Sequence, residues 1–453
     1  MAVWSIIKKS ELEGTSRIDA EYYGPKYLEY CKLLSNHKPL RDYVTKILHP
    51  VEIERVYEAN GVQILLAQNI RDNYLDFSKR VFMPEHVITQ IAKNRLEKND
   101  VVMTRSGVNY GDTAYYDGEP EVIYACADCL VIRPKVISGA YLSTFLNTQI
   151  GKSLVKRGAY GTAQPHIAPE YLRALGIPRG SEKFENEVEK ILDQSKSHFR
   201  QSESFYLQAE QMLLAELSLD KLDFSQPNHY SIPLSQAQGV SRVDAEHFQP
   251  KYDRLIQHLA KTGEAKPLGE IAPYIKRGLQ PTYVEDGEVL VFTEKHLGRL
   301  LLNIEYAETT NTVFWEKNKQ ARVEKNDILL YSIGAYIGRA NCYLEDRRAV
   351  TSSNVTIIRI DGNKANPAYA GVFLNSIVGR MQAEKWTASV GQMALYTGDV
   401  PKFLIYLPSE GFQTKIANLV TQSYKARKKA KALLKQAKEK VEKMILGVNK
   451  DDE

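Results

Sequence analysis

The two thiols of the stretch CADC, Cys126 and Cys129, have the spacing that comes nearest to a metal site in this sequence. A structural zinc ion needs a second pair of ligands at a comparable spacing, and none follows this one. In an extended strand, residues three apart also point to opposite faces. The stretch SSNV occupies the related place in the second half of the chain and has no thiol. We therefore expect both cysteines to pack in the core and predict no metal site.

Two further stretches contain groups that catalysis could use. NPAY, Asn366 to Tyr369, is similar to the Asn-Pro-Pro-Tyr loop that grips a flipped adenine in amino-methyltransferases, but its second proline is missing. Its place before a helix favours a cap in which Asn366 accepts backbone hydrogen bonds. In TEKH, Glu294 and Lys295 have no well-placed acidic partner upstream beyond Asp286, so we expect a surface hairpin and no nuclease site. The sequence also has no GxxxxGK(S/T) loop for a nucleotide and no Gly-rich loop placed to bind S-adenosylmethionine. We predict no catalytic residue.

Polar and basic side chains near Gly-containing turns form the remaining candidate site. Phosphates favour cations, base edges favour fork-shaped donors and acceptors, and loops on a rigid core present both. Any one of these residues is more readily a solvated surface residue than a DNA contact, but their clustering after repeated Gly-containing turns favours the groups as candidate DNA-binding sites. In the first half of the chain the candidates are Lys93, Arg95, Thr104, Arg105, Ser106, Asn109, Tyr110, Arg157, Tyr160, Gln164 and His166. In the second half they are Lys276, Arg277, Gln280, Tyr283, Ser332, Tyr336, Arg339, Lys385, Trp386, Ser389 and Gln392.

The elements that must position these residues occur twice. SRIDAEYYGPKY (16–27) returns as SRVDAEHFQPKY (241–252), and LEKNDVVMTRSG (96–107) returns as VEKNDILLYSIG (323–334). GAYGTAQPHIAPEYLRALGIP (158–178) corresponds in the same order to TASVGQMALYTGDVPKFLIYLP (387–408), with Gln164 facing Gln392. The offset stays between 225 and 228 residues, which indicates a tandem duplication. From Gln392 to Pro408 the second copy is two residues longer than the first copy is from Gln164 to Pro178, and it lacks the QPHI continuation.

Each copy contains both strand and helix patterns. Alternating apolar runs bounded by Gly, Asn and Asp turns predict strands, and one helix follows in each copy, at 140–157 and 368–386. The fold class is therefore α+β, with two similar strand-rich globules in tandem.

A heptad-like apolar seam follows each globule, from Val188 to Leu213 and from Ile416 to Val441. Each seam predicts a helix of roughly 50 Å, and so narrow an apolar stripe requires a second helix beside it. Small residues in both seams, such as Ser195 and Ala430, permit close approach. We expect an antiparallel coiled coil with pseudo-two-fold symmetry between the globules. The second helix is strongly basic at 425–443, which is typical of a solvated face, a DNA contact or a complement to the acidic first helix.

Bulk composition narrows the class of protein without naming its activity. The 453 residues are 43% hydrophobic and 25% charged, which fits an ordinary globular protein. The net charge of +5 favours a polyanionic partner only weakly. The four cysteines do not make a disulfide framework, and we see neither a secretion signal nor a membrane span. We expect a cytoplasmic protein.

The order of globule, long helix, globule and long helix resembles the specificity (S) subunit of type I restriction-modification enzymes. The duplicated KND(V/I) strand and turn, the segments GTAQPHI and SVGQMAL, and the closures LGIP and IYLP match that pattern over nearly the whole chain. The resemblance implies two target-recognition domains, at 1–182 and 219–410. It also implies two long helices, at 183–218 and 411–447, and leaves an acidic tail at 448–453.

The resemblance further implies a non-catalytic subunit that reads one half of a split double-stranded DNA target with each domain. The helices would set the gap and dock two methyltransferase subunits, with restriction subunits joining the assembly. No cofactor is expected in this chain, whereas S-adenosylmethionine, ATP and Mg are expected in the partner subunits. Three alternatives stay open: the specificity subunit of a type IIB system, a coiled-coil scaffold that does not bind DNA, and an enzyme in its own right.

Overall fold

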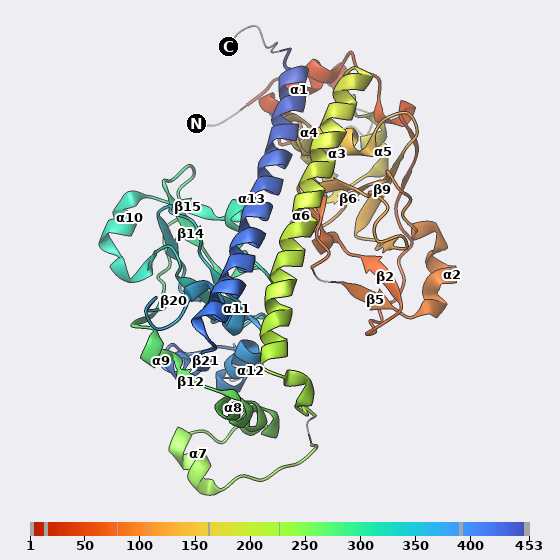
Figure 1. Ribbon diagram of the computed structural model, residues 1–453. Helices are drawn as coiled ribbons and strands as arrows, with labels where there is room; N and C mark the ends of the chain where they lie inside the picture. The colour runs from red at the N-terminus through yellow and green to blue at the C-terminus, as the bar shows by residue number, and fades with distance from the viewer. Residues whose placement is uncertain are drawn as a thin grey trace. The chain divides into compact units, whose positions relative to one another are not determined.

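In a computed structural model of the chain, the described residues are 4–12, 17–78, 80–107, 109–161, 164–225, 227–388 and 393–447 (Figure 1). They form two compact units. Unit 1 contains Met1–Phe199 and Lys428–Glu453, and unit 2 contains Arg200–Arg427. The long helices α6 (Glu182–Glu216) and α13 (Glu410–Ile445) occupy the two predicted long-helix regions, and each is divided between the units. Mixed helix and strand content, as the α+β prediction requires, is present in both units.

Unit 1 is built on a four-stranded antiparallel sheet and a smaller three-stranded sheet. The first has the order β1 (Val44–Leu48), β9 (Cys129–Pro134), β6 (Val101–Thr104), β7 (Thr113–Tyr115). The second has the order β5 (Val81–Met83), β2 (Val62–Leu65), β8 (Tyr124–Ala125), and its β2 and β8 are parallel. Two short antiparallel pairs complete the unit, β3 (Ile70–Arg71) with β4 (Tyr74–Leu75) and β10 (Ala159–Tyr160) with β11 (His166–Ile167).

Unit 2 has the same strand order in its main sheet, and its second sheet has one strand more. Its main sheet runs β13 (Tyr274–Arg277), β20 (Val355–Arg359), β17 (Ile328–Tyr331), β18 (Ala340–Cys342), and all neighbours are antiparallel. The second sheet runs β15 (Glu308–Thr310), β14 (Val289–Phe292), β19 (Ala349–Thr351), β16 (Arg322–Val323), with β14 and β19 parallel. A third pair joins β12 (Ala265–Pro267) to β21 (Leu404–Tyr406). The parallel neighbours in both second sheets occupy equivalent places.

The main sheet of each unit is buried on both faces. Along β6, Val101 and Met103 belong to one apolar cluster and Val102 to another. Along β17, Ile328 and Leu330 belong to one apolar cluster and Leu329 belongs to another. Successive side chains of a strand point to opposite faces, so helices cover one face and the second sheet covers the other. The strand runs read from the sequence are confirmed, and their nearly continuous apolar character follows from this double burial.

The single helix predicted near the end of each globule is wrong, because each is two helices. The pairs are α3 (Gly139–Asn147) with α4 (Gln149–Arg157), and α11 (Pro367–Asn375) with α12 (Ile377–Trp386). Thr148 and Ser376 adopt extended backbone conformations, and their hydroxyls accept the N–H groups of Gly151 and Val378. Such capping residues compete with a continuous helix. The periodicity alone continues across the break and therefore conceals it.

The remaining helices are short apart from α8. They are α1 (Pro25–Leu34), α2 (Ile88–Ile91), α5 (Pro169–Ala174), α7 (Leu234–Val240), α8 (Pro250–Thr262), α9 (Leu268–Ile271) and α10 (Thr312–Lys317). None of the helices in the described part of the chain combines the length and apolar character needed to cross a membrane.

Segments of α6 and α13 contact each other within each unit. In unit 1 the hydroxyl of Ser195 donates to the carbonyl of Ala430 at 2.9 Å, and Lys440 lies 2.9 Å from the carboxylate of Glu187. In unit 2 the hydroxyl of Ser423 donates to the carbonyl of Ser202 at 2.7 Å. In unit 1 the contact nearer the start of α6 falls nearer the end of α13, so these two segments are antiparallel. Small side chains at the contacts allow the backbones to come this close.

Much of the basic run of α13 is used inside the units. Lys438 lies 2.5 Å from the carboxylate of Asp72, and the ammonium of Lys431 lies 4.4 Å from the ring centroid of Tyr74. In unit 2, Arg427 lies 3.6 Å from Glu305. Together with the Lys440 contact to α6, these pairs show that several of the cations complement acidic and aromatic neighbours.

Candidate nucleic-acid interface

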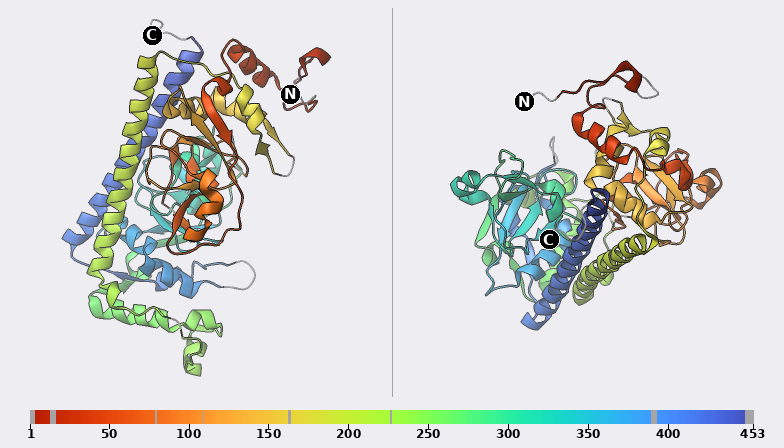
Figure 2. Two further views of the ribbon diagram at one scale, coloured as in Figure 1. Left: turned by 90° about the vertical axis from the view of Figure 1, so that its right-hand side faces the viewer. Right: turned by 90° about the horizontal axis from the view of Figure 1, so that it is seen from above.

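The Gly-rich segment of the first repeat forms a hairpin. Ala159 pairs with Ile167 and Tyr160 with His166, and Figure 2 (left) shows this hairpin in yellow, projecting from the rest of unit 1. Gly161 has a φ of +95°, and a side chain there would meet the carbonyl of Gln164 at 2.8 Å. The turn therefore needs glycine. Tyr160 is 48% exposed, and Gln164 is exposed as well.

A second loop adjoins this hairpin. The N–H of Ile167 donates to the carbonyl of Arg105 at 3.1 Å, and Ser106 forms a bridge with His166. Lys156 lies 5.9 Å from the ring centroid of Tyr110, which is in the same loop. We call residues 104–112 and 158–168 loop pair 1. The structure thus brings together most of the candidates from the first half of the sequence.

The second repeat builds the same junction. The N–H of Leu395 donates to the carbonyl of Ser332 at 2.8 Å, and Ala388 and Ala394 exchange two backbone hydrogen bonds. We call residues 331–339 and 387–396 loop pair 2. Tyr336 in it is 45% exposed. The candidates Ser389 and Gln392 lie outside the described residues, so the facing of Gln164 and Gln392 stays a prediction.

Several candidates are buried and contact the interior of their own unit. These are Thr104, Ser106, Arg157, Ser332 and Lys385, which are 1–8% exposed. The hydroxyl of Ser332 lies 2.7 Å from that of Thr356, and Nε of Arg157 donates to the carbonyl of Tyr22 at 2.9 Å. Their side chains hold the framework of the loops, so we leave them out of the surface that faces a ligand.

Arg339 is half-buried. Its guanidinium lies 3.8 Å from the ring centroid of Tyr336 and donates to the carbonyl of Leu297 at 3.4 Å. Burial lowers the pKa of Arg339 below its ordinary value, because the charged form loses contact with water. Arginine still carries its charge at neutral pH. The guanidinium thus supports the exposed ring of Tyr336 from beneath.

The other unit 2 candidates lie beside loop pair 2. Lys276 and Arg277 are exposed on β13, where Arg277 pairs with Thr356, the neighbour of Ser332. Gln280 follows, and its amide donates to the hydroxyl of Tyr283 at 3.1 Å. Lys276 and Arg277, as successive residues of a strand, point to opposite faces of the main sheet, and the polar pair of Gln280 and Tyr283 follows that strand.

Two of the remaining candidates lie at the loop pairs, and two others lie elsewhere in unit 1. Asn109 is exposed in loop pair 1, and Trp386 is half-buried at the root of loop pair 2 with Lys402 lying 4.3 Å from its ring centroid. Lys93 and Arg95 are exposed at the second sheet, where Arg95 bridges Tyr124.

Sequence reasoning missed four residues at these loops. Met393 and Tyr396 in loop pair 2 are 50% and 60% exposed. The sequence signal that could have identified them is a large side chain within a Gly-containing loop. Arg17 and Arg242 contact the roots of the loop pairs. Their segments were recognised as repeats, but a repeat does not reveal which backbone carbonyl a side chain reaches.

The thiols of Cys126 and Cys129 are buried in the core, as expected, but the expectation that they point to opposite faces is wrong. Cys126 follows β8 directly and Cys129 is the first residue of β9. In the turn between them the N–H of Cys129 donates to the carbonyl of Cys126, and the sulfurs are 3.7 Å apart. The hydrogen bond between the two thiols lowers the pKa of Cys126 and raises that of Cys129, which burial raises further.

The two other stretches also have structural roles. Asn366 caps α11, where its side-chain oxygen accepts the N–H groups of Ala368 and Tyr369, so the helix-cap interpretation of NPAY is confirmed. TEKH is not a hairpin, because Glu294–His296 forms a short 3-10 helix. Nδ1 of the buried His296 accepts the N–H of Thr293 at 2.9 Å and closes this turn.

Comparisons with known proteins agree with this description. Residues 261–442 match the family model described as the type I restriction modification DNA specificity domain. No curated protein matches the chain. The S subunit of a type I restriction-modification system from M. genitalium is similar in structure, with 12% identity, coverage of 91% of this chain and 94% of that chain, and a TM-score of 0.43. The HsdS subunit from Thermoanaerobacter tengcongensis is 13% identical, with coverage of 90% and 96% and a TM-score of 0.29.

The family match covers most of unit 2, including its main sheet and loop pair 2, and it confirms the resemblance predicted from the sequence. Residues 261–442 of the chain are therefore similar to the type I restriction modification DNA specificity domain.

Proposed function

We propose that this protein is the DNA specificity subunit of a type I restriction-modification complex. The observation that carries the proposal is the family match to unit 2 together with the repetition of its strand order in unit 1. Each unit presents exposed aromatic and polar side chains on loops above a rigid sheet, and such side chains can reach base edges and phosphates. Tyr160 and Gln164 in unit 1, and Tyr336 and Arg277 in unit 2, are the leading candidates for that contact.

Each loop pair reads one half of a bipartite target in this proposal. The frameworks share their bonding, whereas the loop sequences differ, TRSGVNYGD in one and YSIGAYIGR in the other. Two different half-sites need this combination of a common scaffold and different surfaces. The long helices pair as an antiparallel coiled coil and set the distance between the half-sites. The serine contacts between α6 and α13 within each unit support this pairing.

The chemistry belongs to partner subunits. Two methyltransferase subunits that use S-adenosylmethionine dock on the helices, and restriction subunits bring ATP and Mg. The chain itself acts in the cytoplasm as a non-catalytic reader of DNA. A type IIB system, in which one partner chain fuses both activities, would use the same loop pairs, and the neighbouring gene distinguishes the two.

A loop exchange tests the proposal. Methylome sequencing of cells with and without the gene gives the split target motif. Replacing loop pair 1 by that of a relative with another target is expected to change one half of the motif and leave the other. A change in both halves would contradict independent reading. If the assembled complex binds this DNA no better than competitor DNA, the protein is a scaffold and the proposed function fails.

A further inference from the structure

The best-preserved repeat of the sequence, SRIDAE and SRVDAE, has no part in the proposed contacts with DNA. We propose that Arg17 and Arg242 are positioning residues, each of which fixes the root of one loop pair and so maintains discrimination at one half-site. The inference rests on the proposed function for its DNA readout. We call residues 17–24 strap 1 and residues 242–249 strap 2.

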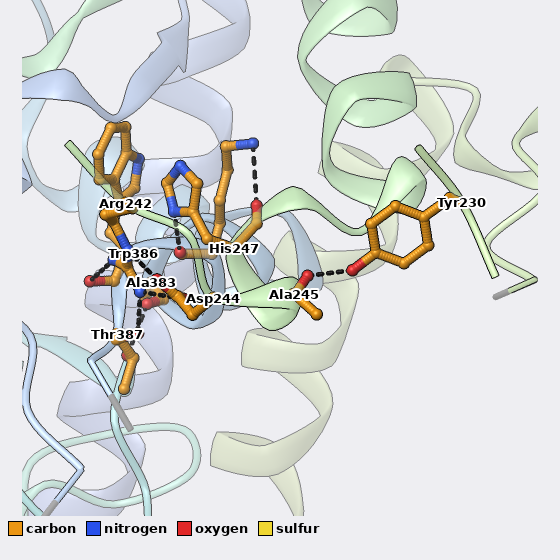
Figure 3. A network of polar contacts seen from close by, with 9 residues as sticks. Tyr230, Arg242, Asp244, Ala245, His247, Ala383, Trp386 and Thr387 are labelled. Carbon is orange, nitrogen blue, oxygen red and sulfur yellow. Dashed lines mark hydrogen bonds and ion pairs between the residues drawn. The ribbon is translucent and has the colours of Figure 1, made fainter. Parts of the chain in front are cut away.

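Strap 2 reaches the end of α12 (Figure 3). Nη1 of Arg242 donates to the carbonyl of Trp386 at 3.2 Å, and Nη2 donates to the carbonyl of Thr387 at 3.0 Å. The last carbonyls of a helix have no partner within it and carry partial negative charge. A guanidinium donates hydrogen bonds to these carbonyls and also brings a positive charge to the negative end of the helix. It thereby sets the direction in which the chain leaves α12 to form loop pair 2.

A carboxylate holds the guanidinium in place. Asp244 accepts two hydrogen bonds from Arg242, at 2.8 and 2.6 Å. This bidentate pair fixes the plane of the guanidinium, so that the remaining donors point at the carbonyls. Hydrogen bonding to Arg242 lowers the pKa of Asp244, so the pair stays ionised at neutral pH.

Strap 1 repeats the arrangement in unit 1. Arg17 makes a bidentate pair with Asp19, at 2.8 and 2.7 Å, and its Nη1 donates to the carbonyl of Ala159 at 3.1 Å. Ala159 is the first residue of β10 and therefore the root of the hairpin. The same pair of residue types, two positions apart, thus contacts the same place in both repeats.

A second contact fastens each strap to the last turn of the neighbouring helix. In unit 1, Arg157 on α4 donates to the carbonyl of Tyr22, and its guanidinium lies 3.7 Å from the ring centroid of that tyrosine. In unit 2, Lys385 on α12 donates to the carbonyl of His247 at 3.3 Å, and Nδ1 of His247 lies 2.7 Å from the carbonyl of Lys385. The internal contacts of Arg157 and Lys385 are therefore the same contact in two copies.

Arg17 and Arg242 affect the position of the loops more than they affect the stability of the core. The side chains of Arg17 and Arg242 are 25% and 17% exposed, and neither is a member of an apolar cluster. Removing the guanidinium frees the backbone carbonyl or carbonyls at the root of one loop pair, and in unit 1 it also removes a contact with the ring of Tyr22, whose centroid lies 4.3 Å from the guanidinium of Arg17. We expect a local change in loop position with the unit still folded.

The test uses the full chain assembled with its methyltransferase subunits. The probes are a duplex bearing the motif found by methylome sequencing and two duplexes in which one half-site is scrambled. Arg242→Ala is expected to reduce discrimination at the half-site of unit 2 about tenfold, which is the effect of losing one charge-assisted hydrogen bond, and to leave the other half-site unchanged. Arg17→Ala is expected to reduce discrimination at the half-site of unit 1 and to leave that of unit 2 unchanged. Arg242→Lys keeps the positive charge but loses the two parallel N–H donors of the guanidinium. Its discrimination at the half-site of unit 2 is expected to lie between those of the unaltered protein and Arg242→Ala.

Arg254→Ala is the matched control. Arg254 also pairs with an aspartate, Asp223, at 3.1 Å and donates to the carbonyl of Ser225, but it is not part of a strap. Equal losses for Arg254→Ala and Arg242→Ala, or a loss at both half-sites from either strap variant, would overturn the proposal. Thermal melting shows whether each variant is folded. If an alanine variant does not fold, the comparison of half-site discrimination is made with the corresponding lysine variant.

Amide hydrogen exchange gives a readout that does not depend on DNA. Arg242→Ala is expected to speed exchange at residues 393–396 and to leave residues 164–167 unchanged, with the reverse for Arg17→Ala. Unchanged exchange at both places would refute the positioning role. If the wild-type complex does not distinguish intact from scrambled duplexes while the exchange result holds, the proposed function fails and the positioning role remains.

Discussion

Units 1 and 2 differ in their loops and agree in the bonds beneath them. In unit 1, Arg133 makes two hydrogen bonds of 2.8 Å to Asp100, and in unit 2, Arg359 makes two of 2.8 Å to Asp327. Each aspartate also accepts a backbone N–H at 2.7 Å, from Glu97 and Glu324. The loop pairs share almost no exposed side chain. Duplication has therefore preserved the polar contacts of the interior, where an unpaired group is costly, and left the exposed loops free to diverge.

The largest effect is expected from removing one of these buried aspartates. Asp100→Ala leaves Arg133 without its main partner, and Asp327→Ala does the same to Arg359, so each variant should lose about 3 kcal/mol of unfolding free energy. The two losses should be similar because the bonding is the same. Chemical denaturation of the full chain measures both.

Asp346→Ala serves as the control for this pair. Asp346 contacts Lys325 at 2.8 Å, but its side chain is 78% exposed, so its loss should cost less than about 1 kcal/mol. If one buried aspartate proves as dispensable as Asp346, the two frameworks are not energetically equivalent.

A smaller effect is expected at the breaks between the paired helices. A side chain at Gly151 would meet the carbonyl of Phe145 at 2.1 Å, and one at Gly379 would meet the carbonyl of Leu374 at 2.1 Å. Gly151→Ala and Gly379→Ala must therefore shift backbone, at a cost of about 1–3 kcal/mol each. Thermal melting checks the prediction, and Gly362→Ala, where a side chain would meet open space, is the control. If Gly151→Ala or Gly379→Ala melts at the same temperature as the unaltered protein, the close approach at that helix break does not require glycine.

The smallest effect is expected from pH, and only in unit 2. Burial lowers the pKa of His247 below its ordinary value, whereas Tyr22 occupies the equivalent position in strap 1. The unfolded chain then binds a proton more readily than the folded one below the ordinary histidine pKa of about 6.5, so strap 2 is fully stable above that pH and weakens as the pH falls. Once the intrinsic exchange rate, which itself falls with pH, is divided out, the protection of the amides of residues 393–396 should decrease on acidification.

His247→Tyr makes strap 2 resemble strap 1 and should abolish this pH dependence. Exchange at residues 164–167 of the unaltered protein provides the internal reference, since strap 1 has no histidine. Equal acid sensitivity at both loop pairs would assign the effect to groups outside the straps.

The duplication and the strand runs could be predicted from the sequence because they depend on periodicity and on identical residues at a fixed offset. The helix break at Thr148 could not, because a capping threonine and a helical threonine look alike until the backbone direction is known. Most candidate segments form loops in the structure, whereas Arg157 and Lys385, which were predicted to bind DNA, contact the interior of their own units. Their partners, Tyr22 and His247, are more than a hundred residues away in sequence, and no local pattern connects them.

Unit 2 is one continuous stretch of chain, whereas unit 1 is assembled from the two ends. This has a consequence for synthesis on the ribosome. Leu434, Ala437 and Val441 pack in the same apolar cluster as Val188 and Leu192, so this cluster of unit 1 is incomplete until α13 has left the ribosome. All residues of unit 2 are synthesised before that point. During their synthesis, unit 1 therefore keeps part of one apolar cluster uncovered.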